Sequence, residues 1–404
     1  MVLQQQRGAG RTQGSTVAME AALLRAAHRA GVPVPRVLAA GEADGLDAGW
    51  LVVERLEGET IARRLLRDDA YAEARSSLAG DVATALAQIH TIAATEIPGL
   101  PSVDPFERPL DVLDGIGEVR PILELGSRWL AANRPPASGR TVVHGDFRMG
   151  NFLVDTTGLR GILDWELAHL GDPAEDLGWL SARAWRFGGS GEVGGFCRLD
   201  EFLRHYEASS GRAIDPGTVR WWQVYATLKW AVICALQASA HLTGATRSVE
   251  LAAIGRRVCE SEWDLLGLIG IARPDMPAVT RNTSASPAPF GRPSALELTE
   301  AVSEYLGDKV MATADAGARF EARVARNVLE MVARELTLGP GIEAAHRLRL
   351  AELGFIDDGA LAAAIRAGDL DGSLGEVSSM LARSALDQLR VANPGYVAAP
   401  DGPQ

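Results

Sequence analysis

The sequence is poor in lysine and in net positive charge. Lys229 and Lys309 are its two lysines, and 52 acidic residues outweigh 40 lysines and arginines, so the net charge is −12. A surface that binds nucleic acid needs clustered basic residues to neutralise phosphates, and this sequence contains no basic stripe. Nucleic acid is therefore not expected as a partner. The high ratio of arginine to lysine, with abundant alanine and glycine, suggests a GC-rich genome.

Cysteine and long apolar runs are also scarce. Cys197, Cys234 and Cys259 form no Cys-x-x-Cys pair, so we expect buried thiols in a reducing compartment rather than a disulfide framework. The N-terminus has no basic-then-apolar signal sequence. The most apolar stretch, residues 230–242, is too short to span a bilayer and follows Lys229, which predicts a core helix. These absences predict a cytoplasmic protein without a membrane segment.

The composition itself is that of a globular protein. The 404 residues are 47% hydrophobic and 23% charged, and a chain of this length can form two or three packed units. Residues 273–293 are polar, interrupted by prolines and without periodicity, which makes them the best candidate for a linker.

The most informative segment is residues 143–154, Val-His-Gly-Asp-Phe-Arg-Met-Gly-Asn-Phe-Leu-Val, followed by Ile-Leu-Asp-Trp-Glu at residues 162–166. Phosphorylation of a hydroxyl group needs one carboxylate that orients and deprotonates the hydroxyl. It also needs oxygen ligands that hold Mg²⁺ against nucleotide phosphates. Asp146 fits the first role, and Asn151 with Asp164 fits the second.

The spacer between Asn151 and Asp164 supports this assignment. Residues 152–155 and 159–163 are apolar and strand-like, and Thr156-Thr157-Gly158 between them is typical of a turn. We expect a β-hairpin that returns Asp164 to the side of Asn151, as a shared metal ion requires.

Both motifs resemble those of the aminoglycoside/choline phosphotransferase branch of the protein-kinase-like superfamily. That branch carries H-G-D-x-x-x-x-N and I/L-D-W/F-E, and residues 144–151 and 162–166 match these patterns without a gap. The resemblance implies an α+β, protein-kinase-like fold of two lobes. It also implies ATP or GTP and Mg²⁺ as cofactors, and transfer of the γ-phosphate to a hydroxylated small molecule. A protein kinase is not expected, because no A-P-E motif follows Asp164 and H-G-D stands where H-R-D is required.

The resemblance also indicates where the nucleotide binds. Residues 49–56 match the last strand of the small lobe, so the backbone near Glu54, Arg55 and Leu56 is expected to meet the adenine. In the family, a small-lobe lysine contacts the phosphates and pairs with a glutamate on the next helix. Glu20 is the expected glutamate.

The lysine of that pair is missing from the sequence. Gln4 occupies the strand position where it should stand, and two preceding strands with their phosphate-covering loop are also missing, so we expect a truncated N-terminal lobe. Either Arg7 or Arg11 could supply the cation, since arginine offers charge and a bidentate fork. Alternatively, the chain begins inside a longer gene, or the protein is a degenerate, kinase-like binding or scaffold protein without catalytic activity.

Several other polar residues are interpreted as structural. Asp172 and Asp176 match positions that brace the catalytic loop in the family, and His90 is expected to be a hydrogen-bonded packing histidine. Trp221 and Trp222 are adjacent on a helix and cannot both face one interior, so one should line a pocket or an interface.

The acceptor stays open between two classes. Polycationic aminoglycosides need many carboxylates on the substrate helices, and residues 199–240 offer four: Asp200, Glu201, Glu207 and Asp215. A less charged hydroxylated metabolite, such as a hydroxyacyl thioester, is at least as well supported.

The C-terminal part is predicted to be all-helical. Ser294-Ala295-Leu296-Glu297 is a capping box that opens one helix, and a second is expected to end at Gly339-Pro340-Gly341. This part resembles an uncharacterised helical module of some bacterial family members, for which we expect protein docking or homo-oligomerisation. The predicted segments are a small lobe at 1–57, a catalytic and substrate-binding lobe at 58–272, a linker at 273–293 and a helical domain at 294–395.

Overall fold

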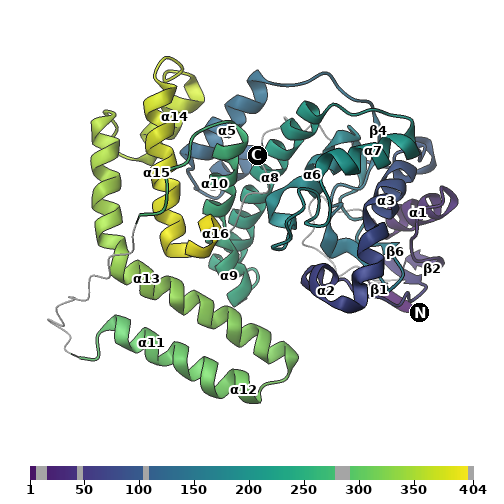
Figure 1. The fold of residues 1–404 in the computed structure, drawn as a ribbon, viewed down its shortest axis with the longest axis horizontal. Coiled ribbons are helices and arrows are strands. Elements are labelled where there is room, and N and C mark those ends of the chain that lie inside the picture. Colours follow the sequence, from purple (N-terminus) through teal and green to yellow (C-terminus); the bar gives the residue numbers. More distant parts are fainter. Residues whose placement is uncertain (6–15, 43–48, 103–108, 278–291, 399–404) are drawn as a thin grey trace. The chain divides into compact units, whose positions relative to one another are not determined.

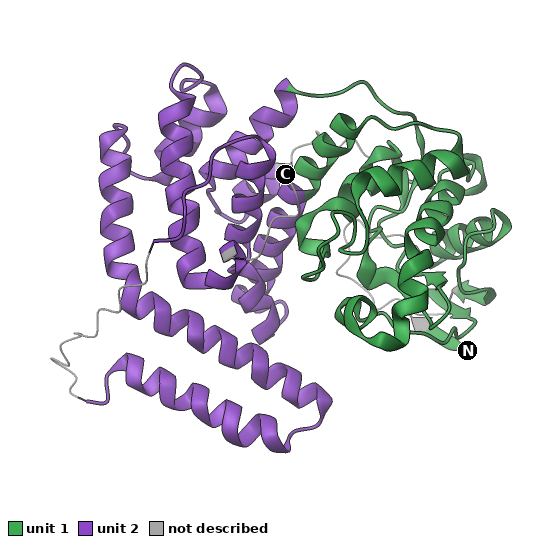
Figure 2. Cartoon of the chain, viewed as in Figure 1, with its two compact units in different colours: residues 1–107, 133–226, 401–404 green, residues 108–132, 227–400 purple. Residues whose placement is uncertain are grey.

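The computed structural model describes residues 1–5, 16–42, 49–102, 109–277 and 292–398 (Figure 1). Contacts divide the chain into two compact units, both built from discontinuous stretches (Figure 2). Unit 1 comprises Met1–Glu107, Asn133–Ala226 and Asp401–Gln404, and unit 2 comprises Arg108–Ala132 and Thr227–Pro400. Helix α8 (Pro216–Leu242) therefore begins in unit 1 and ends in unit 2.

Unit 1 begins with a small antiparallel sheet in the order β1-β3-β2. Its strands are β1 (Val2–Gln5), β2 (Val37–Glu42) and β3 (Gly49–Val53). Helix α1 (Val17–Arg29) packs on β2 and β3. Thr16 caps α1 by accepting a hydrogen bond from the Met19 amide at 3.2 Å.

The rest of unit 1 combines two short strand pairs with helices. The strands are β4 (Thr141–Val143), β5 (Phe152–Val154), β6 (Leu159–Ile162) and β7 (His169–Gly171), and the antiparallel pairs are β4 with β7 and β5 with β6. The helices are α2 (Ala62–Arg67), α3 (Ala72–Ile89), α6 (Ala174–Ser181) and α7 (Leu199–Ser210), with α3 packed on α7. The hairpin predicted between Asn151 and Asp164 is confirmed by the β5–β6 pair.

A short backbone bridge joins the exit of the small sheet to the β5–β6 hairpin. Glu59 and Val154 exchange two backbone hydrogen bonds, of 2.8 and 3.0 Å. The extended segment after β3 is thereby held beside the hairpin that carries Asp164 at its end.

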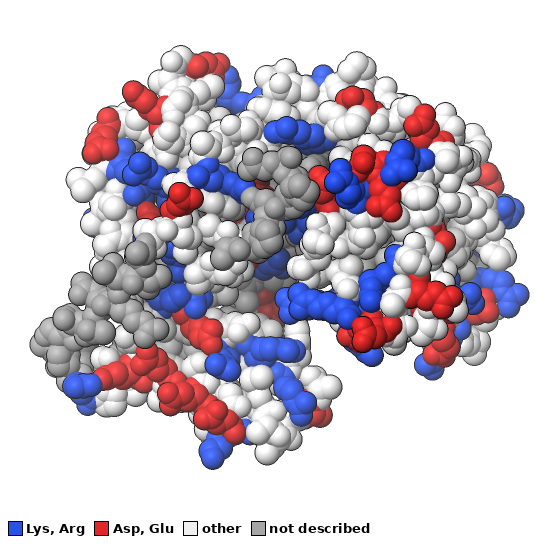
Figure 3. All heavy atoms as spheres, viewed as in Figure 1, with Lys and Arg blue, Asp and Glu red and all other residues white. Residues whose placement is uncertain are grey.

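Unit 2 is entirely helical in its described part. Its helices are α4 (Pro109–Gly115), α5 (Pro121–Ala132), the end of α8, α9 (Val249–Gly255), α10 (Val258–Leu268), α11 (Ala295–Tyr305), α12 (Met311–Thr313), α13 (Ala316–Glu352), α14 (Asp358–Ala367), α15 (Leu374–Ala392) and α16 (Pro394–Ala398). The predicted capping box at Ser294 and Glu297 is confirmed. α11 packs on α13, and Figure 3 shows acidic side chains in a row along α11.

The C-terminal helices pack directly on α5 and α10. Arg366 of α14 forms ion pairs with the exposed Asp114, at 2.9 Å, and with the buried Glu124 of α5. Arg128 of α5 binds Asp371 at 2.6 Å. These charged contacts, together with the packing of α15 on α10, make the C-terminal helices an integral part of unit 2.

The predicted end of a helix at Gly339-Pro340-Gly341 is wrong, because α13 continues through Pro340 to Glu352. A proline inside a helix removes one backbone hydrogen bond and clashes with the preceding turn, which kinks the helix without necessarily ending it. Figure 1 shows α13 changing direction along its length. Packing of α13 on α9, α11 and α15 supports the helix on both sides of the bend.

The cysteines and the apolar helices can be compared with the predictions of no disulfide framework and no membrane segment. Cys197, Cys234 and Cys259 are free and buried, as predicted. Among the helices that the structure describes, none combines the length and the apolar character needed to cross a bilayer.

Candidate active site

The loop from His144 to Asn151 joins β4 to β5, and the carboxylate of Asp176 holds its first two residues. Asp176 of α6, which is fully buried, accepts hydrogen bonds from the backbone amides of His144 at 2.8 Å and Gly145 at 2.9 Å. Gly145 has a φ of +78°, and a Cβ atom there would collide with the carbonyl oxygen of Leu167. The sharp turn therefore needs glycine, and it presents the next residue, Asp146, at a fixed position.

The carboxylate of Asp146 is held by three donors. Arg148 Nε lies 2.9 Å from Oδ1 and 3.1 Å from Oδ2, Trp179 Nε1 donates to Oδ1 at 2.9 Å, and Asn151 Nδ2 donates to Oδ2 at 2.7 Å. Asp146 is 8% exposed. The arrangement fixes the orientation of a carboxylate that still reaches the surface, as a group that must meet an incoming hydroxyl requires.

Asn151 and Asp164 are brought together by the backbone. The amide of Leu163 donates to the carbonyl oxygen of Asn151 at 2.9 Å, so the residue before Asp164 lies against the catalytic loop. Asn151 Nδ2 is used by Asp146, whereas Oδ1 has no hydrogen-bond partner among the described residues. Asp164 is exposed and has a φ of +63°, which is unusual for a residue other than glycine and common at functional sites.

These two side chains fit a magnesium ion. Mg²⁺ is held in phosphate-binding sites by one or two carboxylate or amide oxygens, with the remaining positions filled by water and phosphate oxygens. An exposed carboxylate and an amide oxygen that accepts nothing from the described residues supply that donor set. Within the described chain, no group of three or more His, Cys, Asp or Glu residues could hold a metal on its own.

His144 supports the loop from its buried side. Its Nε2 donates to the carbonyl oxygen of Leu163 at 3.1 Å, its Nδ1 accepts from the Asp146 amide at 3.3 Å, and its ring packs on Trp165. These partners fix the neutral tautomer with the proton on Nε2. Burial is the main reason that the pKa of His144 is lowered, although Asp176 and Asp146 act in the opposite direction.

The stability of unit 1 should therefore fall as the pH falls below about 6.5, the usual pKa of histidine. The folded protein keeps His144 neutral, so the unfolded chain takes up the proton first and gains stability of up to about 1.4 kcal/mol per pH unit. Asp176 acts at lower pH: burial opposes its ionised form, but its hydrogen bonds with His90 and the His144 amide lower its pKa. Its contribution is full above its usual pKa of 3.8 and is lost as the pH falls through the folded value.

Thermal unfolding followed by tryptophan fluorescence at pH 7.5, 6.5 and 5.5 measures this dependence. His144→Gln, which cannot titrate, should flatten the change of the midpoint over this range. A midpoint that changes equally in both proteins would contradict the role given to His144.

The predicted nucleotide-contact residues lie in two places. Glu54, Arg55 and Leu56 follow β3, and a Cβ atom on Gly161 of β6 would lie 3.0 Å from Leu56 Cδ1, so Leu56 packs on the β5–β6 hairpin. The side chains of Glu54 and Arg55 form exposed ion pairs with Arg36, at 2.8 Å, and Glu57, at 3.2 Å. Only the backbone of this segment is therefore suited to an adenine contact, which stays a prediction.

The predicted phosphate contacts are less well defined. Glu20 lies in the first turn of α1 and is half-buried. Gln4 lies in β1 opposite Leu51, and Arg7 and Arg11 lie outside the described residues. The roles of Glu20, Arg7 and Arg11 stay predictions.

Three residues that contact the site were missed by the sequence analysis: Arg148, Trp179 and Trp185. Trp179 binds Asp146, and the guanidinium of Arg148 lies 4.6 Å from the ring centre of Trp185. Arg148 stands inside the recognised loop, and its position two residues after Asp146 was the available signal. The tryptophans gave no local signal, because Trp179 stands 33 residues after Asp146 and both tryptophans reach the loop only through the fold.

The residues interpreted as structural are confirmed in that role. His90 is buried, with Nδ1 2.7 Å from the hydroxyl of Tyr206 and Nε2 3.2 Å from Asp176. Asp172 accepts from the amides of Ser138 at 2.7 Å and Ala174 at 2.9 Å. Asp172 and Asp176 thus each accept a hydrogen bond from a backbone amide next to β4, Asp172 from Ser138 before the strand and Asp176 from His144 after it.

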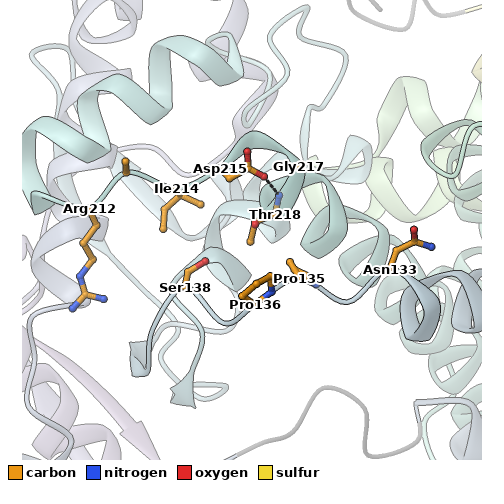
Figure 4. A pocket seen from close by; sticks show the side chains of 10 residues that line it. Asn133, Pro135, Pro136, Ser138, Arg212, Ile214, Asp215, Gly217 and Thr218 are labelled. Carbon is orange, nitrogen blue, oxygen red and sulfur yellow. Dashed lines mark hydrogen bonds between the residues drawn. The ribbon is translucent and has the colours of Figure 1, made fainter.

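Two neighbouring cavities in unit 1 lie apart from the reaction residues. The larger, about 680 Å³, lies between residues 133–138 and 212–218; Figure 4 shows Asp215 accepting from the Thr218 amide at its edge. The smaller, about 370 Å³, is lined in part by Trp221 and Trp222, which are both buried and in contact. The expectation that the two could not share one interior was therefore wrong, while the expectation of a pocket wall is confirmed. Neither cavity is lined by Asp146, Asn151 or Asp164.

Two parts of the chain match known families. Residues 1–222 match the phosphotransferase enzyme family. Residues 312–396 match a domain of unknown function, DUF6285.

Two similar proteins carry names of different enzyme classes, a dehydrogenase and a phosphotransferase. The chain is 29% identical over 171 residues to Acyl-CoA dehydrogenase family member 11 of Gallus gallus, covering 39% of this chain and 22% of that protein. It is 29% identical over 178 residues to an aminoglycoside 3'-phosphotransferase of Streptomyces fradiae, covering 41% and 63% respectively. The match thus spans about a fifth of the first relative and less than two thirds of the second.

A solved structure of similar fold is a provisionally assigned aminoglycoside phosphotransferase from Ralstonia eutropha. The TM-score is 0.51 at 20% identity, and the alignment covers 66% of this chain and 91% of that one. A likeness at this identity concerns the fold alone. With the family match, it confirms the predicted α+β, protein-kinase-like fold with a helical C-terminal region.

Proposed function

The chain belongs to the phosphotransferase enzyme family, which spans residues 1–222, and from that premise we propose that it transfers the γ-phosphate of ATP or GTP to a hydroxyl group of a small molecule. The observation that carries the proposal is the joint placement of three residues, Asp146, Asn151 and Asp164. Asn151 binds Asp146 directly, and the residue preceding Asp164 is hydrogen-bonded to Asn151. These are the acid–base and phosphate-holding groups that the reaction needs.

In the proposed reaction, Asp146 accepts the proton of the acceptor hydroxyl. The acceptor oxygen forms a bond to the γ-phosphorus, and the bond between that phosphorus and the bridging oxygen breaks, so the nucleoside diphosphate leaves with the electron pair. Trp179 and Asn151 keep the carboxylate oriented during this transfer. Asn151 Oδ1 and Asp164 would hold Mg²⁺, which when bound neutralises phosphate charge.

The acceptor is proposed to be a hydroxylated small molecule that is not a polycation. Asp146 is ion-paired with the guanidinium of Arg148, so its carboxylate offers no uncompensated negative charge to a cationic acceptor. The scarcity of carboxylates in residues 199–240 supports the same conclusion.

Thermal-shift titration with ATP and GTP, with and without Mg²⁺, tests the nucleotide site. A ligand at 100 times its Kd adds about 2.7 kcal/mol to native-state stability, which should raise the midpoint by about 5 °C. Asp164→Ala should lose the part of the shift that depends on Mg²⁺, whereas Asp69→Ala, an exposed carboxylate elsewhere in unit 1, should keep it.

The alternative function, a kinase-like binding or scaffold protein, makes the opposite prediction. If millimolar ATP and GTP with Mg²⁺ leave the midpoint unchanged, the phosphotransferase proposal is wrong and the scaffold function is favoured.

A further inference from the structure

The guanidinium of Arg148 lies at the reaction centre with most of its donors unused. Only Nε is engaged, by Asp146, and Nη1 and Nη2 have no hydrogen-bond partner among the described residues. The side chain is 25% exposed, so these donors can reach a ligand. A guanidinium with both terminal nitrogens free is suited to bidentate binding of a phosphate or carboxylate.

The surroundings of Arg148 are shaped to hold this group. Its guanidinium lies 4.6 Å from the ring centre of the buried Trp185, a cation–π contact that fixes the plane of the guanidinium without using an N–H donor. A Cβ atom on Gly150 would collide with Nη1, so the glycine leaves room for the guanidinium. The ring of Trp185 and the space left by Gly150 thus hold the guanidinium of Arg148 in place. Arg148 stands between Asp146 and Asn151 in the sequence.

Unit 1 contains no lysine. Both lysines of the chain, Lys229 and Lys309, belong to unit 2. A phosphoryl group that meets both Asp146 and Asn151 must lie close to the loop between them, and Arg148 is in that loop.

We infer that Arg148 is a cation that binds the transferred phosphoryl group; this inference rests on the proposed function. Before nucleotide binds, the guanidinium neutralises Asp146. The γ-phosphoryl group carries more negative charge than one carboxylate, and it engages Nη1 and Nη2, which leaves Asp146 available to the acceptor hydroxyl. The contact involves the γ-phosphate, so a nucleoside diphosphate does not make it.

Calorimetric titration of the full-length protein with a non-hydrolysable ATP analogue and with ADP, in Mg²⁺, tests this inference. Arg148→Gln should weaken binding of the triphosphate analogue by about tenfold to a hundredfold, the usual effect of losing a charge-assisted hydrogen bond. Binding of ADP should change by less than about threefold. Arg204→Gln, an exposed arginine of α7, should change neither affinity.

Gly150→Ala provides a second variant that keeps the charge. Its methyl group displaces Nη1, which is the end of a flexible side chain, so the fold should tolerate it. It should also weaken triphosphate binding selectively, which tests the position of the guanidinium if Arg148→Gln does not fold.

The outcomes separate the two proposals. Equal changes for triphosphate and diphosphate, or no change in either variant, would overturn the role of Arg148 while leaving the proposed function intact. Failure of the wild-type protein to bind either nucleotide would overturn both.

Discussion

Asp146→Asn should lower kcat by about a thousandfold while leaving the affinity for ADP within about threefold of the wild-type value. Asparagine has the shape of aspartate but cannot accept the acceptor's proton, and general-base catalysis contributes about 10²- to 10⁴-fold. Its Oδ1 can still accept from Trp179 Nε1 and Arg148 Nε, as the carboxylate does. Oδ2 is replaced by a donor, so Asn151 Nδ2 keeps the backbone carbonyl oxygen of residue 146 as its acceptor. The substitution therefore removes the chemical step with little change to the loop.

The measurement is phosphate transfer from labelled ATP or GTP to a hydroxylated acceptor found by screening, with nucleotide affinity determined separately by calorimetry. Asp69→Asn is the matched control, because Asp69 is an exposed carboxylate in unit 1. A variant at Asp146 that keeps more than a tenth of wild-type kcat would show that this carboxylate is not the base.

Asp176→Ala should destabilise unit 1 by about 3–5 kcal/mol, the range seen when one member of a buried charged network is removed. Asp176 is fully buried, and its loss leaves the amides of His144 and Gly145 without their acceptor and His90 Nε2 without its partner. Each unsatisfied buried donor carries a desolvation cost of its own. Turnover should also fall, because the same amides position Asp146.

Hydrogen exchange locates this effect. The amides of His144 and Gly145 should exchange orders of magnitude faster in Asp176→Ala, together with a lowered thermal midpoint. Asp69→Ala should change stability by less than about 0.5 kcal/mol, as is usual for exposed positions. Unchanged protection of both amides would show that Asp176 does not hold the turn.

The parts of the site that the sequence predicted are those with local signals. Asp146, Asn151 and Asp164 are linked by one loop and one hairpin, so their spacing and the turn at Thr156-Thr157-Gly158 suffice to bring them together. Asp176 was recognisable because it stands in a motif of its own. Such arguments rest on turn chemistry and strand alternation, which act over a few residues.

The parts that could not be predicted depend on contacts between distant residues. Trp179 and Trp185 reach Asp146 and Arg148 only after α6 packs against the loop. α13 passes through Pro340 because packing on both sides outweighs the local preference to stop. The pairing of Arg128 with Asp371 joins positions 243 residues apart, for which no local pattern exists.

That separation affects how the protein is made. During synthesis, α5 emerges early, yet Arg366, the partner of its buried Glu124, follows 242 residues later. At 5–20 residues per second, the ribosome needs about 12–50 s to deliver α14. Throughout that interval the nascent chain holds α5 with an uncompensated carboxylate and an open apolar face, which is the kind of surface that chaperones bind. Gene fragments cut before α14 would keep the chain in this state permanently, so recombinant versions should include the C-terminal helices.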